Sequence, residues 1–240
     1  MISKNEVKYI QSLSDKKNRD REGMFVAEGP KLVNDLLANG LFSKIIFTTK
    51  NAADYSQYKT ETKEITLQDL QRISQWETPN EVIGIFYKKK VSPFYFKNSL
   101  TLALDGIQDP GNLGTIIRTA DWFGITQIIA SPDTVDCYNS KVIQSTMGSI
   151  ARVNMHYTDL TLVLADAGIT VIGALLAGKN LYQLDALTEG IIVIGNESKG
   201  IRNEVLPLIG QAVTIPRFGK AESLNAAIAT GIILSHFTRR

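Results

Sequence analysis

The chain has 240 residues, of which 44% are hydrophobic, and carries a formal net charge of +2 at neutral pH. This length suits one large domain or two small ones, and the hydrophobic content excludes a disordered chain. The net charge is too small to indicate nucleic-acid binding by itself, because phosphate recognition depends on where positive charge lies.

The sequence contains no pattern for a membrane-spanning or secreted protein. Its apolar runs are far shorter than the roughly 20 residues that cross a bilayer. The N-terminal segment has no apolar core behind its charges and no small-residue cleavage site. A single cysteine, Cys137, cannot form an internal disulfide. We therefore expect a cytoplasmic protein.

The first half of the chain mixes helical and strand patterns. Helices are expected at residues 4–13, 30–37 and 67–76, and strands at residues 24–27, 44–49, 64–66 and 82–87. Pro30 and Gly40 suit the start and end of the second helix. These elements predict a compact α/β domain over residues 1–90. A linker over residues 91–99 follows, because this stretch contains Pro93 and little periodicity.

The second half, residues 100–240, alternates short apolar runs with helical patterns. The strands are expected at residues 100–105, 126–130, 151–155, 169–175, 190–195 and 212–215. Such alternation predicts a mainly parallel sheet covered on both faces. Ligands of such sheets bind at the carboxyl ends of the strands. Three loops at such ends, residues 109–114, 195–200 and 216–225, are rich in glycine, asparagine and charged residues.

The sequence contains no complete motif for several common classes of functional site. No G-x-G-x-x-G follows a strand, and no G-x-S-x-G is present. Residues 173–180 have the spacing of a P-loop, but Asn180 replaces the required Ser or Thr, and the intervening residues are apolar. His156, His236 and Cys137 lack the spacing of metal ligands, so no metal is expected.

In the first loop, Asn112 is expected to cap a helix whose apolar face includes Ile116. Arg118 lies about 200° around the helix from Ile116 and should be exposed. A solvated surface position is the ordinary explanation. Because a helix N-terminus attracts anions, a phosphate-facing role is the functional alternative.

The other two loops are ambiguous when each is taken alone. Gly195 allows close approach of a ligand, and Glu197 can accept hydrogen bonds or simply close a turn. Ser223 precedes an alanine-rich helix and is a candidate N-cap for it.

Taken together, the three loops resemble the three motifs of the SpoU-type, or TrmH-like, branch of the SPOUT RNA methyltransferases. The matches are Asn112-x-Gly114-x-x-x-Arg118, Gly195-Asn196-Glu197-x-x-Gly200 and Ile215-Pro216-x-x-Gly219-x-x-Ser223-Leu224-Asn225. The resemblance covers residues 100–240. A weaker resemblance, at Phe25-Val26-Ala27-Glu28-Gly29, is to the L30e-like RNA-binding domain of that family.

The resemblance implies an α/β fold: a parallel-sheet SPOUT methyltransferase domain with a deep trefoil knot, preceded by a small L30e-like domain. The knot follows from the resemblance alone, since topology rules argue against knots. The implied cofactor is S-adenosylmethionine. Its implied contacts are mainly backbone and apolar, at Ala174, Leu175, Gly195, Ile215 and Leu224.

The implied reaction is methyl transfer to a ribose 2′-hydroxyl, which needs proton removal and in-line placement. Arg118 ranks first as catalytic residue, and its role stays open between base, hydroxyl orientation and phosphate clamp, because an ordinary guanidinium is a poor base. The remaining motif residues would position it, the ribose or the RNA; they are Asn112, Glu197, Ser223 and Asn225. Arg217 and Phe218 depart from the family pattern beside the cofactor loop.

The expected partners are RNA and a second copy of the chain, since similar proteins form homodimers. The basic residues expected to contact RNA are Lys16, Lys17, Arg19 and Arg21. Ribosomal RNA is favoured over transfer RNA as substrate. Two alternatives remain open: an inactive RNA-binding assembly factor on the same scaffold, and a nucleotide-dependent enzyme using residues 173–179.

Overall fold

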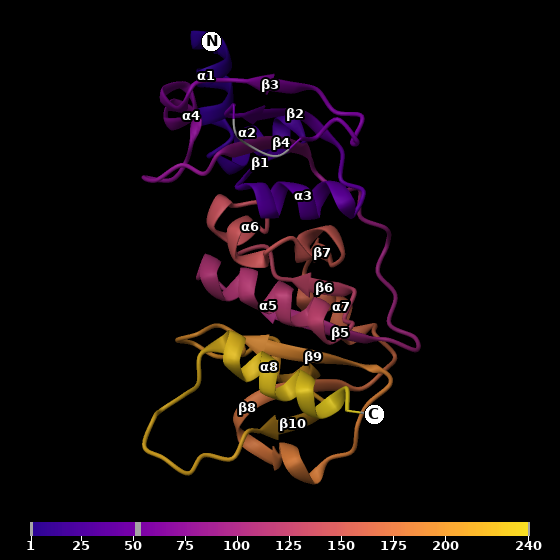
Figure 1. The fold of residues 1–240 in the computed structure, drawn as a ribbon. Coiled ribbons are helices and arrows are strands. Elements are labelled where there is room, and N and C mark those ends of the chain that lie inside the picture. The colour runs from indigo at the N-terminus through magenta and orange to yellow at the C-terminus, as the bar shows by residue number, and fades with distance from the viewer. Residues whose placement is uncertain (1, 51–53, 240) are drawn as a thin grey trace. The chain divides into compact units, whose positions relative to one another are not determined.

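The computed structural model describes residues 2–50 and 54–239 (Figure 1). Contacts between Cα atoms divide the chain into two compact units. Unit 1 comprises Met1–Lys90 together with Asp136–Ala151, and unit 2 comprises Val91–Val135 together with Arg152–Arg240. A segment from the second half of the sequence therefore completes the first unit.

Unit 1 is built on a four-stranded sheet of order β1-β4-β2-β3, antiparallel except for the β2–β3 pair. The strands are β1 (Met24–Glu28), β2 (Ser43–Thr48), β3 (Thr62–Glu64) and β4 (Val82–Tyr87). The helices are α1 (Lys4–Ser12), α2 (Lys16–Glu22), α3 (Pro30–Ala38), α4 (Leu67–Ile73) and α6 (Ser140–Thr146), with a 3-10 turn η1 (Ser149–Ala151).

Local hydrogen bonds define the ends of the first two helices. Ser3 and Glu6 form a reciprocal capping box at the start of α1. The polar basic stretch that follows forms α2, because Asp15 caps its N-terminus and Gly23, at φ 64°, ends it in the left-handed conformation. This helix has no apolar periodicity, so the sequence pattern did not indicate it.

Helices cover both faces of the unit 1 sheet. Ile83 and Ile85 point into the core beneath α1 and α4, which also contains Ile10 and Leu70. On the opposite face the Phe25 ring stacks on Phe86, with 5.7 Å between centroids, and lies 4.8 Å from the Tyr138 ring.

Segment 136–151 is bound to unit 1 by a buried ion pair as well as by packing. The guanidinium of Arg19, which is 3% exposed, donates two hydrogen bonds to Asp136 Oδ2, at 3.0 and 2.6 Å. Arg19 also donates to the carbonyls of Leu13 and Ser14. Lys89 donates to the carbonyl of Ala151 at the other end of the segment. The segment is therefore an integral part of the unit.

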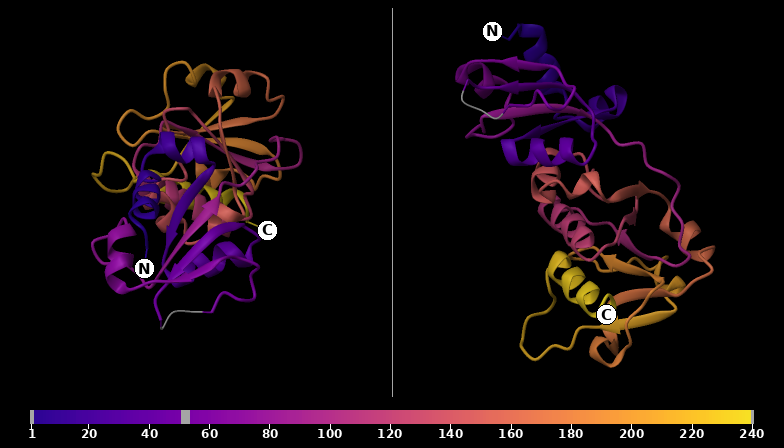
Figure 2. Two further views of the ribbon diagram at one scale, coloured as in Figure 1. Left: turned by 90° about the horizontal axis from the view of Figure 1, so that it is seen from above. Right: turned by 45° about the vertical axis from the view of Figure 1, so that its right-hand side comes forward.

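Unit 2 is a six-stranded parallel sheet of order β10-β8-β9-β5-β6-β7 (Figures 1 and 2). The strands are β5 (Leu100–Asp105), β6 (Gln127–Ala130), β7 (Asn154–Tyr157), β8 (Val171–Asn180), β9 (Gly190–Gly195) and β10 (Gln211–Thr214). The helices are α5 (Pro110–Trp122), α7 (Leu160–Ala165) and α8 (Ala226–Phe237), with 3-10 turns η2 (Leu181–Gln183) and η3 (Leu206–Leu208). The α/β fold and the parallel sheet agree with the sequence-based prediction, although the third strand starts at Asn154 rather than at residue 151.

Alternate residues of the central strands face different helices. Ala103 and Val193 pack against Leu160 and Leu164 of α7, whereas Ile192 and Ile194 lie on the side of α8. Helices α5 and α8 pack side by side (Figure 2, right). A methyl carbon at Gly231 of α8 would lie 3.8 Å from Thr119 of α5, which is an ordinary van der Waals contact, so the two helices are close at this position.

Strand β8 is longer than predicted and irregular. Gly173 pairs with Ala212, but the next pair joins Lys179 to Val213, so residues 174–178 are left out of the pairing with β10. These residues form an excursion at the carboxyl end of the sheet. Among the described residues, no helix is long and apolar enough to span a bilayer.

Candidate functional site

One hydrogen-bond chain joins the three sequence motifs. Asn112 Nδ2 donates to Glu197 Oε1 at 2.8 Å, and Asn225 Nδ2 donates to Asn112 Oδ1 at 2.7 Å. Asn112 is 85 residues from Glu197 and 113 residues from Asn225 along the chain. The fold therefore brings one amide or carboxylate from each motif to a single place, with Asn112 at its centre.

The caps of the two helices at this place differ from the prediction. Asp109, not Asn112, is the N-cap of α5, and its carboxylate accepts from the backbone N–H of Asn112 at 2.7 Å. Pro110 then occupies the first helical position, which it favours. Asn225, not Ser223, caps α8, accepting from the backbone of Ala227 and Ile228. The side chain of Asn112 is thus free of capping and available to bridge its two partners.

Helices α5 and α8 therefore begin next to each other. The bond between Asn112 and Asn225 links their first turns, and both helix axes carry partial positive charge at that end. Two helix N-termini at one place favour an anionic group more than either does alone.

The second motif forms a tight turn after β9. Asn196 Nδ2 donates to the carbonyl of Gly106 at 2.6 Å, and Asn196 Oδ1 accepts from the backbone of Ser198 and Lys199. A methyl carbon at Gly195 would lie 2.3 Å from the backbone carbon of Gly200. Only glycine fits here, because the turn folds back against the end of its own strand.

An ion pair that the sequence did not reveal holds the far side of the same turn. Asp105 is completely buried at the end of β5, and it accepts from both the backbone N–H and the Nε of Arg202, at 2.8 and 2.6 Å. Arg202 also lies 3.6 Å from Asp133. The turn bearing Glu197 is thereby fixed at both ends, by Asn196 and by Arg202.

Arg118 and Ser223 do not join this hydrogen-bond chain. Arg118 is exposed, as its helical position predicted, and has no hydrogen bond or ion pair with any residue in the described ranges. It lies six residues beyond Asn112, which is about 9 Å along the helix axis. Ser223 is exposed in the loop before α8. Both side chains are open to a ligand.

Four of the five residues expected to contact the cofactor lie within or directly after three neighbouring strands. Ala174 and Leu175 open the excursion of β8, Gly195 ends β9, and Ile215 follows β10. Leu224 lies next to Asn225 and is 47% exposed. Because β10, β8 and β9 are adjacent and parallel, these segments lie together at the carboxyl ends of the strands.

The segment with P-loop spacing is not a phosphate loop. Residues 173–180 lie within β8, and only the three-residue turn η2 follows. A P-loop requires a glycine-rich loop that leads directly into a helix. The alternative of a nucleotide-dependent enzyme at this segment is therefore wrong. The described part of the chain also contains no group of three or more His, Cys, Asp or Glu side chains suited to a metal ion.

The basic residues of α2 separate into two kinds. Lys16, Lys17 and Arg21 are exposed, and Arg21 pairs with the neighbouring Glu22. Arg19 is buried against Asp136 and departs from the expected role as an RNA contact, because its guanidinium does not reach solvent.

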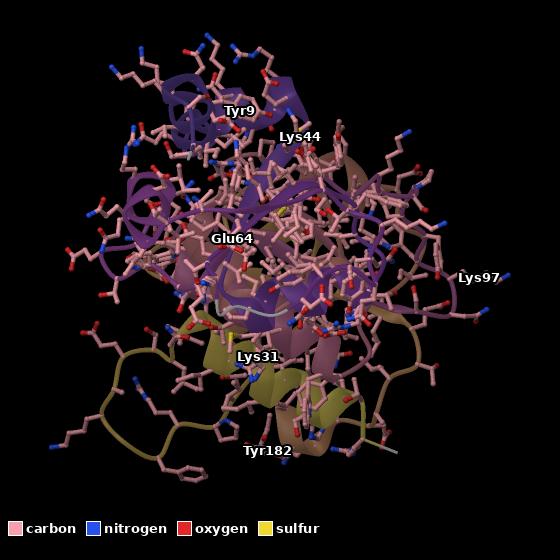
Figure 3. All side chains as sticks on the ribbon, turned by 45° about the horizontal axis from the view of Figure 1, so that its top comes forward. Tyr9, Lys31, Lys44, Glu64, Lys97 and Tyr182 are labelled. Carbon is pink, nitrogen blue, oxygen red and sulfur yellow. The ribbon has the colours of Figure 1, made fainter. Side chains whose placement is uncertain are left out.

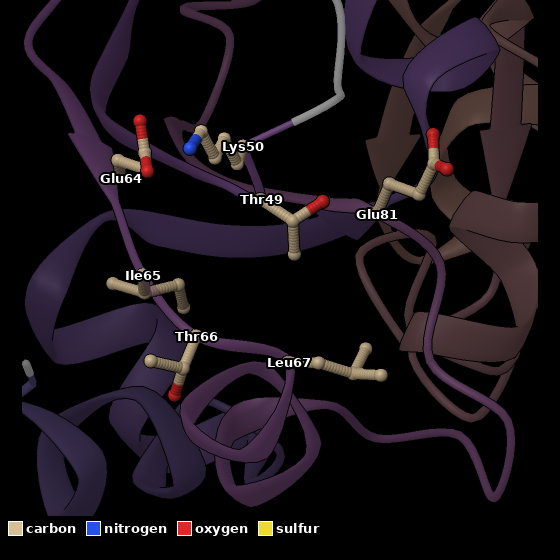
Figure 4. Close-up of a pocket in the computed structure, with 7 residues that line it drawn as sticks. All are labelled: Thr49, Lys50, Glu64, Ile65, Thr66, Leu67 and Glu81. Atoms are coloured by element: carbon tan, nitrogen blue, oxygen red, sulfur yellow. The ribbon is translucent and has the colours of Figure 1, made fainter.

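Unit 1 also contains a pocket of about 560 Å³ (Figure 4). Its lining residues are Thr49, Lys50, Glu64, Ile65, Thr66, Leu67 and Glu81. None of them is a motif residue, and the two carboxylates outnumber the single lysine. An RNA phosphate would be repelled there, so we do not assign the pocket to the reaction.

Comparison with protein families identifies both halves of the chain. The model of the SpoU rRNA Methylase family matches residues 99–235, and that of the MRM3-like substrate binding domain matches residues 4–84. The 23S rRNA (guanosine(2553)-2′-O)-methyltransferase RlmP of Bacillus subtilis is 30% identical over 240 residues, which cover 96% of this chain and 95% of the relative.

Solved structures give the same result across both units. A Porphyromonas gingivalis protein assigned to the TrmH family of RNA methyltransferases superposes with a TM-score of 0.89 and 39% identity, over 99% of this chain and 98% of its own. The rRNA methyltransferase of Sinorhizobium meliloti, crystallised with AdoMet bound, superposes with a TM-score of 0.87 and 32% identity, over 98% and 94% of the two chains.

Proposed function

The chain belongs to the SpoU rRNA methylase family, and we propose that it transfers a methyl group from S-adenosylmethionine to a ribose 2′-hydroxyl of ribosomal RNA. Relatives along nearly the whole chain are named as rRNA 2′-O-methyltransferases, and one was crystallised with this cofactor. The protein is an enzyme of this class. Ribosomal RNA is the favoured substrate because RlmP and the Sinorhizobium relative carry that name.

The hydrogen-bond chain Glu197–Asn112–Asn225 is the observation that carries the proposal. It links all three motifs within hydrogen-bonding distance and leaves the Glu197 carboxylate beside two helix N-termini. A substrate hydroxyl and an adjacent phosphate need such fixed polar groups for orientation. All three residues of this hydrogen-bond chain are present. This does not support an inactive assembly factor, in which these three positions would be free to change.

The neighbouring loops fit an adenosyl cofactor. Leu176 in the β8 excursion and Leu224 are exposed apolar side chains, at 80% and 47%, which an adenosine would cover. Gly195 leaves backbone groups accessible where a side chain would not fit. We assign Ala174, Leu175, Gly195, Ile215 and Leu224 to cofactor binding. When bound, the cofactor supplies a methyl carbon activated by a positive sulfur.

Methyl transfer breaks the bond from carbon to sulfur, forms the bond from carbon to the 2′-oxygen, and releases the hydroxyl proton. Arg118 is the candidate to touch the ribose or its phosphate, since its guanidinium is exposed and unpaired within the described residues. Asn112, Glu197, Ser223 and Asn225 would hold the hydroxyl in line. Whether Arg118 accepts the proton, orients the hydroxyl or holds the phosphate is decided by its pH profile.

Several finer features belong to the same proposal. We propose a trefoil knot in the methyltransferase domain, residues 100–240, and an L30e-like fold for residues 1–90, joined by a linker over residues 91–99.

We also propose a homodimer, supported by exposed apolar side chains on the adjacent helices α5 and α8: Trp122 is 85% and Ile228 is 55% exposed. A role on ribosomal RNA implies a cytoplasmic location. Lys16, Lys17 and Arg21 are proposed to contact RNA phosphates.

The decisive experiment maps 2′-O-methylation of ribosomal RNA in cells with the gene, without it, and with Arg118→Ala. We expect one site to disappear in the deletion and in the variant. Calorimetry with S-adenosylmethionine measures cofactor binding on the purified protein. The protein is an inactive assembly factor instead if it binds RNA but not S-adenosylmethionine, and if deletion of the gene removes no 2′-O-methylation site.

A further inference from the structure

Two exposed aromatic residues lie on neighbouring chain segments at one end of the unit 1 sheet. Phe42 is 80% exposed and Tyr87 is 44% exposed. The backbone N–H of Tyr87 donates to the carbonyl of Phe42 at 3.0 Å, and Ser43 pairs with Phe86 one step further along. Phe42, the residue before β2, is therefore opposite Tyr87, so their Cα atoms are about 5.5 Å apart and their side chains leave the same face.

The pair extends a well-packed row of the sheet. Ile83 and Ile85, on the same side of β4 as Tyr87, are buried beneath α1 and α4. Across the sheet, Met24 is opposite Tyr87 and accepts a hydrogen bond from the Tyr9 hydroxyl at 3.2 Å. Tyr87 is thus the exposed end of a row of otherwise buried side chains on this face of β4. Exposed rings on a rigid base suit stacking against a planar ligand.

A lysine lies on the same face of the sheet as the pair. Lys44 Nζ lies 4.5 Å from the centre of the Tyr9 ring, where Figure 3 labels the two residues close together. No carboxylate of the described residues pairs with Lys44. The backbone N–H of Lys88, which follows Tyr87, donates to the carbonyl of Gly23 at the end of α2. The side chain of Lys88 leaves the other face of the sheet, where its Nζ lies 5.1 Å from the centre of the Tyr138 ring, so Lys44 and not Lys88 shares the face of Tyr87.

Lys44 is two residues from Phe42 along the chain and is exposed. It has no ion pair among the residues that the structure describes. The surface thus combines aromatic rings with unneutralised positive charge, which matches a nucleic acid better than an apolar protein surface.

We infer that Phe42 and Tyr87 form a stacking site for an unpaired nucleotide of the RNA substrate, with Lys44 holding an adjacent phosphate. The inference rests on the proposed function, since it names a contact of the same substrate. Proteins recognise RNA mainly through unstacked bases, and aromatic side chains stack on any base face. The three catalytic motifs are not involved, because all the residues of the proposed stacking site belong to unit 1.

The test uses the full-length protein and two synthetic hairpin RNAs of equal length that share the same short terminal loop. The stem of one contains an unpaired internal loop, and the stem of the other is fully paired. Fluorescence anisotropy gives the dissociation constants for the wild type, Phe42→Ala, Tyr87→Ala and Phe42→Trp. We expect each alanine substitution to weaken binding of the looped hairpin about tenfold or more, and Phe42→Trp to keep it. Binding of the paired hairpin should change little, because its bases are already stacked.

Leu67→Ala is the matched control, since Leu67 is a 56% exposed apolar residue of the same unit, away from the pair. It should leave both constants unchanged. Equal binding by the wild type and both alanine variants overturns the inference, as does equal weakening for the two hairpins. Calorimetry with S-adenosylmethionine on the same proteins separates this from the proposed function. If the wild type binds cofactor and transfers methyl groups, and the two alanine variants bind RNA as the wild type does, only the stacking site is refuted. Absent cofactor binding in the wild type would refute only the function.

Discussion

Arg202 holds the turn that carries Glu197 by binding a carboxylate that has no access to solvent. Asp105 is completely buried and accepts from the backbone and the guanidinium of Arg202. We therefore expect Arg202→Ala to release the turn and leave a buried carboxylate without its charged partner. The turnover number should fall at least about tenfold, because small misplacements of a positioning group are costly. The free energy of unfolding should fall by about 2 kcal/mol.

Methyl transfer kinetics on RNA measure this effect, and urea unfolding measures the change in stability. The turnover number should fall more than the KM for RNA rises, since Arg202 acts through the turn and not on the substrate. Arg202→Lys should recover part of the activity by keeping the charge. Glu204→Gln is the control, because Glu204 is 58% exposed and 3.7 Å from Arg202. An Arg202→Ala enzyme with unchanged turnover would contradict this role.

Asn112→Asp should make activity depend on pH in a way that Asn112→Ala does not. The introduced carboxylate would face Glu197 Oε1 at the present 2.8 Å, and two carboxylates at one place raise the pKa of one of them. As pH falls, the shared proton restores a hydrogen bond between them. We expect Asn112→Ala to lose about 10- to 100-fold at every pH. The ratio of the Asp to the Ala variant should rise from pH 8 to pH 6, and a flat ratio would reject the bridging role.

Gly195→Ala should weaken cofactor binding without unfolding the protein. The added methyl would lie 2.3 Å from the backbone of Gly200, so the turn must move away from the end of β9. Gly219→Ala is a matched control in the third motif, because nothing lies within 4 Å of its added methyl. Calorimetry with S-adenosylmethionine should show a loss of at least about tenfold for Gly195→Ala and little change for Gly219→Ala. Equal affinities in the two variants would remove Gly195 from the cofactor site.

Asp136→Asn should destabilise unit 1 strongly. Arg19 and Asp136 are 3% and 9% exposed, and removing one partner leaves the other charge buried. Such a loss costs about 3 kcal/mol. Glu22→Gln, which removes the exposed partner of Arg21, should cost less than about 0.5 kcal/mol. Thermal and urea unfolding of the full chain compare the two variants, and similar losses in both would contradict the burial of Arg19.

Glu6 should stabilise unit 1 in a defined range of pH. The hydrogen bond from Lys63, then that from the Ser3 backbone, lower the pKa of Glu6 from 4.5 to about 2. A carboxylate with a lowered pKa in the folded state stabilises fully above pH 4.5, and this stabilisation is lost between pH 4.5 and pH 2. Because the pair is about one third exposed, its contribution is only about 0.5 kcal/mol. The difference in melting temperature between wild type and Glu6→Gln should shrink over that range. A constant difference would mean that the Lys63 pair contributes nothing.

Strands with strong apolar patterns were predictable from the sequence. The predicted strands at residues 82–87, 100–105 and 190–195 have the observed bounds, because each is buried along nearly its whole length. Helix α2 was missed since its stability comes from Asp15 and Gly23 at its ends and not from an apolar face. The tail of β8 was missed because Gly178 and Lys179 do not look like a buried strand.

The site was predictable only in part. That Asn112, Glu197 and Asn225 belong together came from the resemblance to a family, and the structure then placed them within hydrogen-bonding distance. Nothing in the local sequence indicates that Asp105 binds Arg202, 97 residues later. Arg19 looked like any other surface cation, because its buried partner lies 117 residues away. Such pairs depend on the tertiary fold, which local patterns do not encode.

The return of segment 136–151 to unit 1 has a consequence for how the protein is made. A ribosome releases residues 1–90 well before Asp136, so the nascent first unit must wait with Arg19 lacking its carboxylate and Phe25 lacking the Tyr138 ring. By then strands β5 and β6 have also been synthesised. The two units therefore cannot mature one after the other during translation, and a gene fragment that ends at Lys90 encodes an unfinished domain.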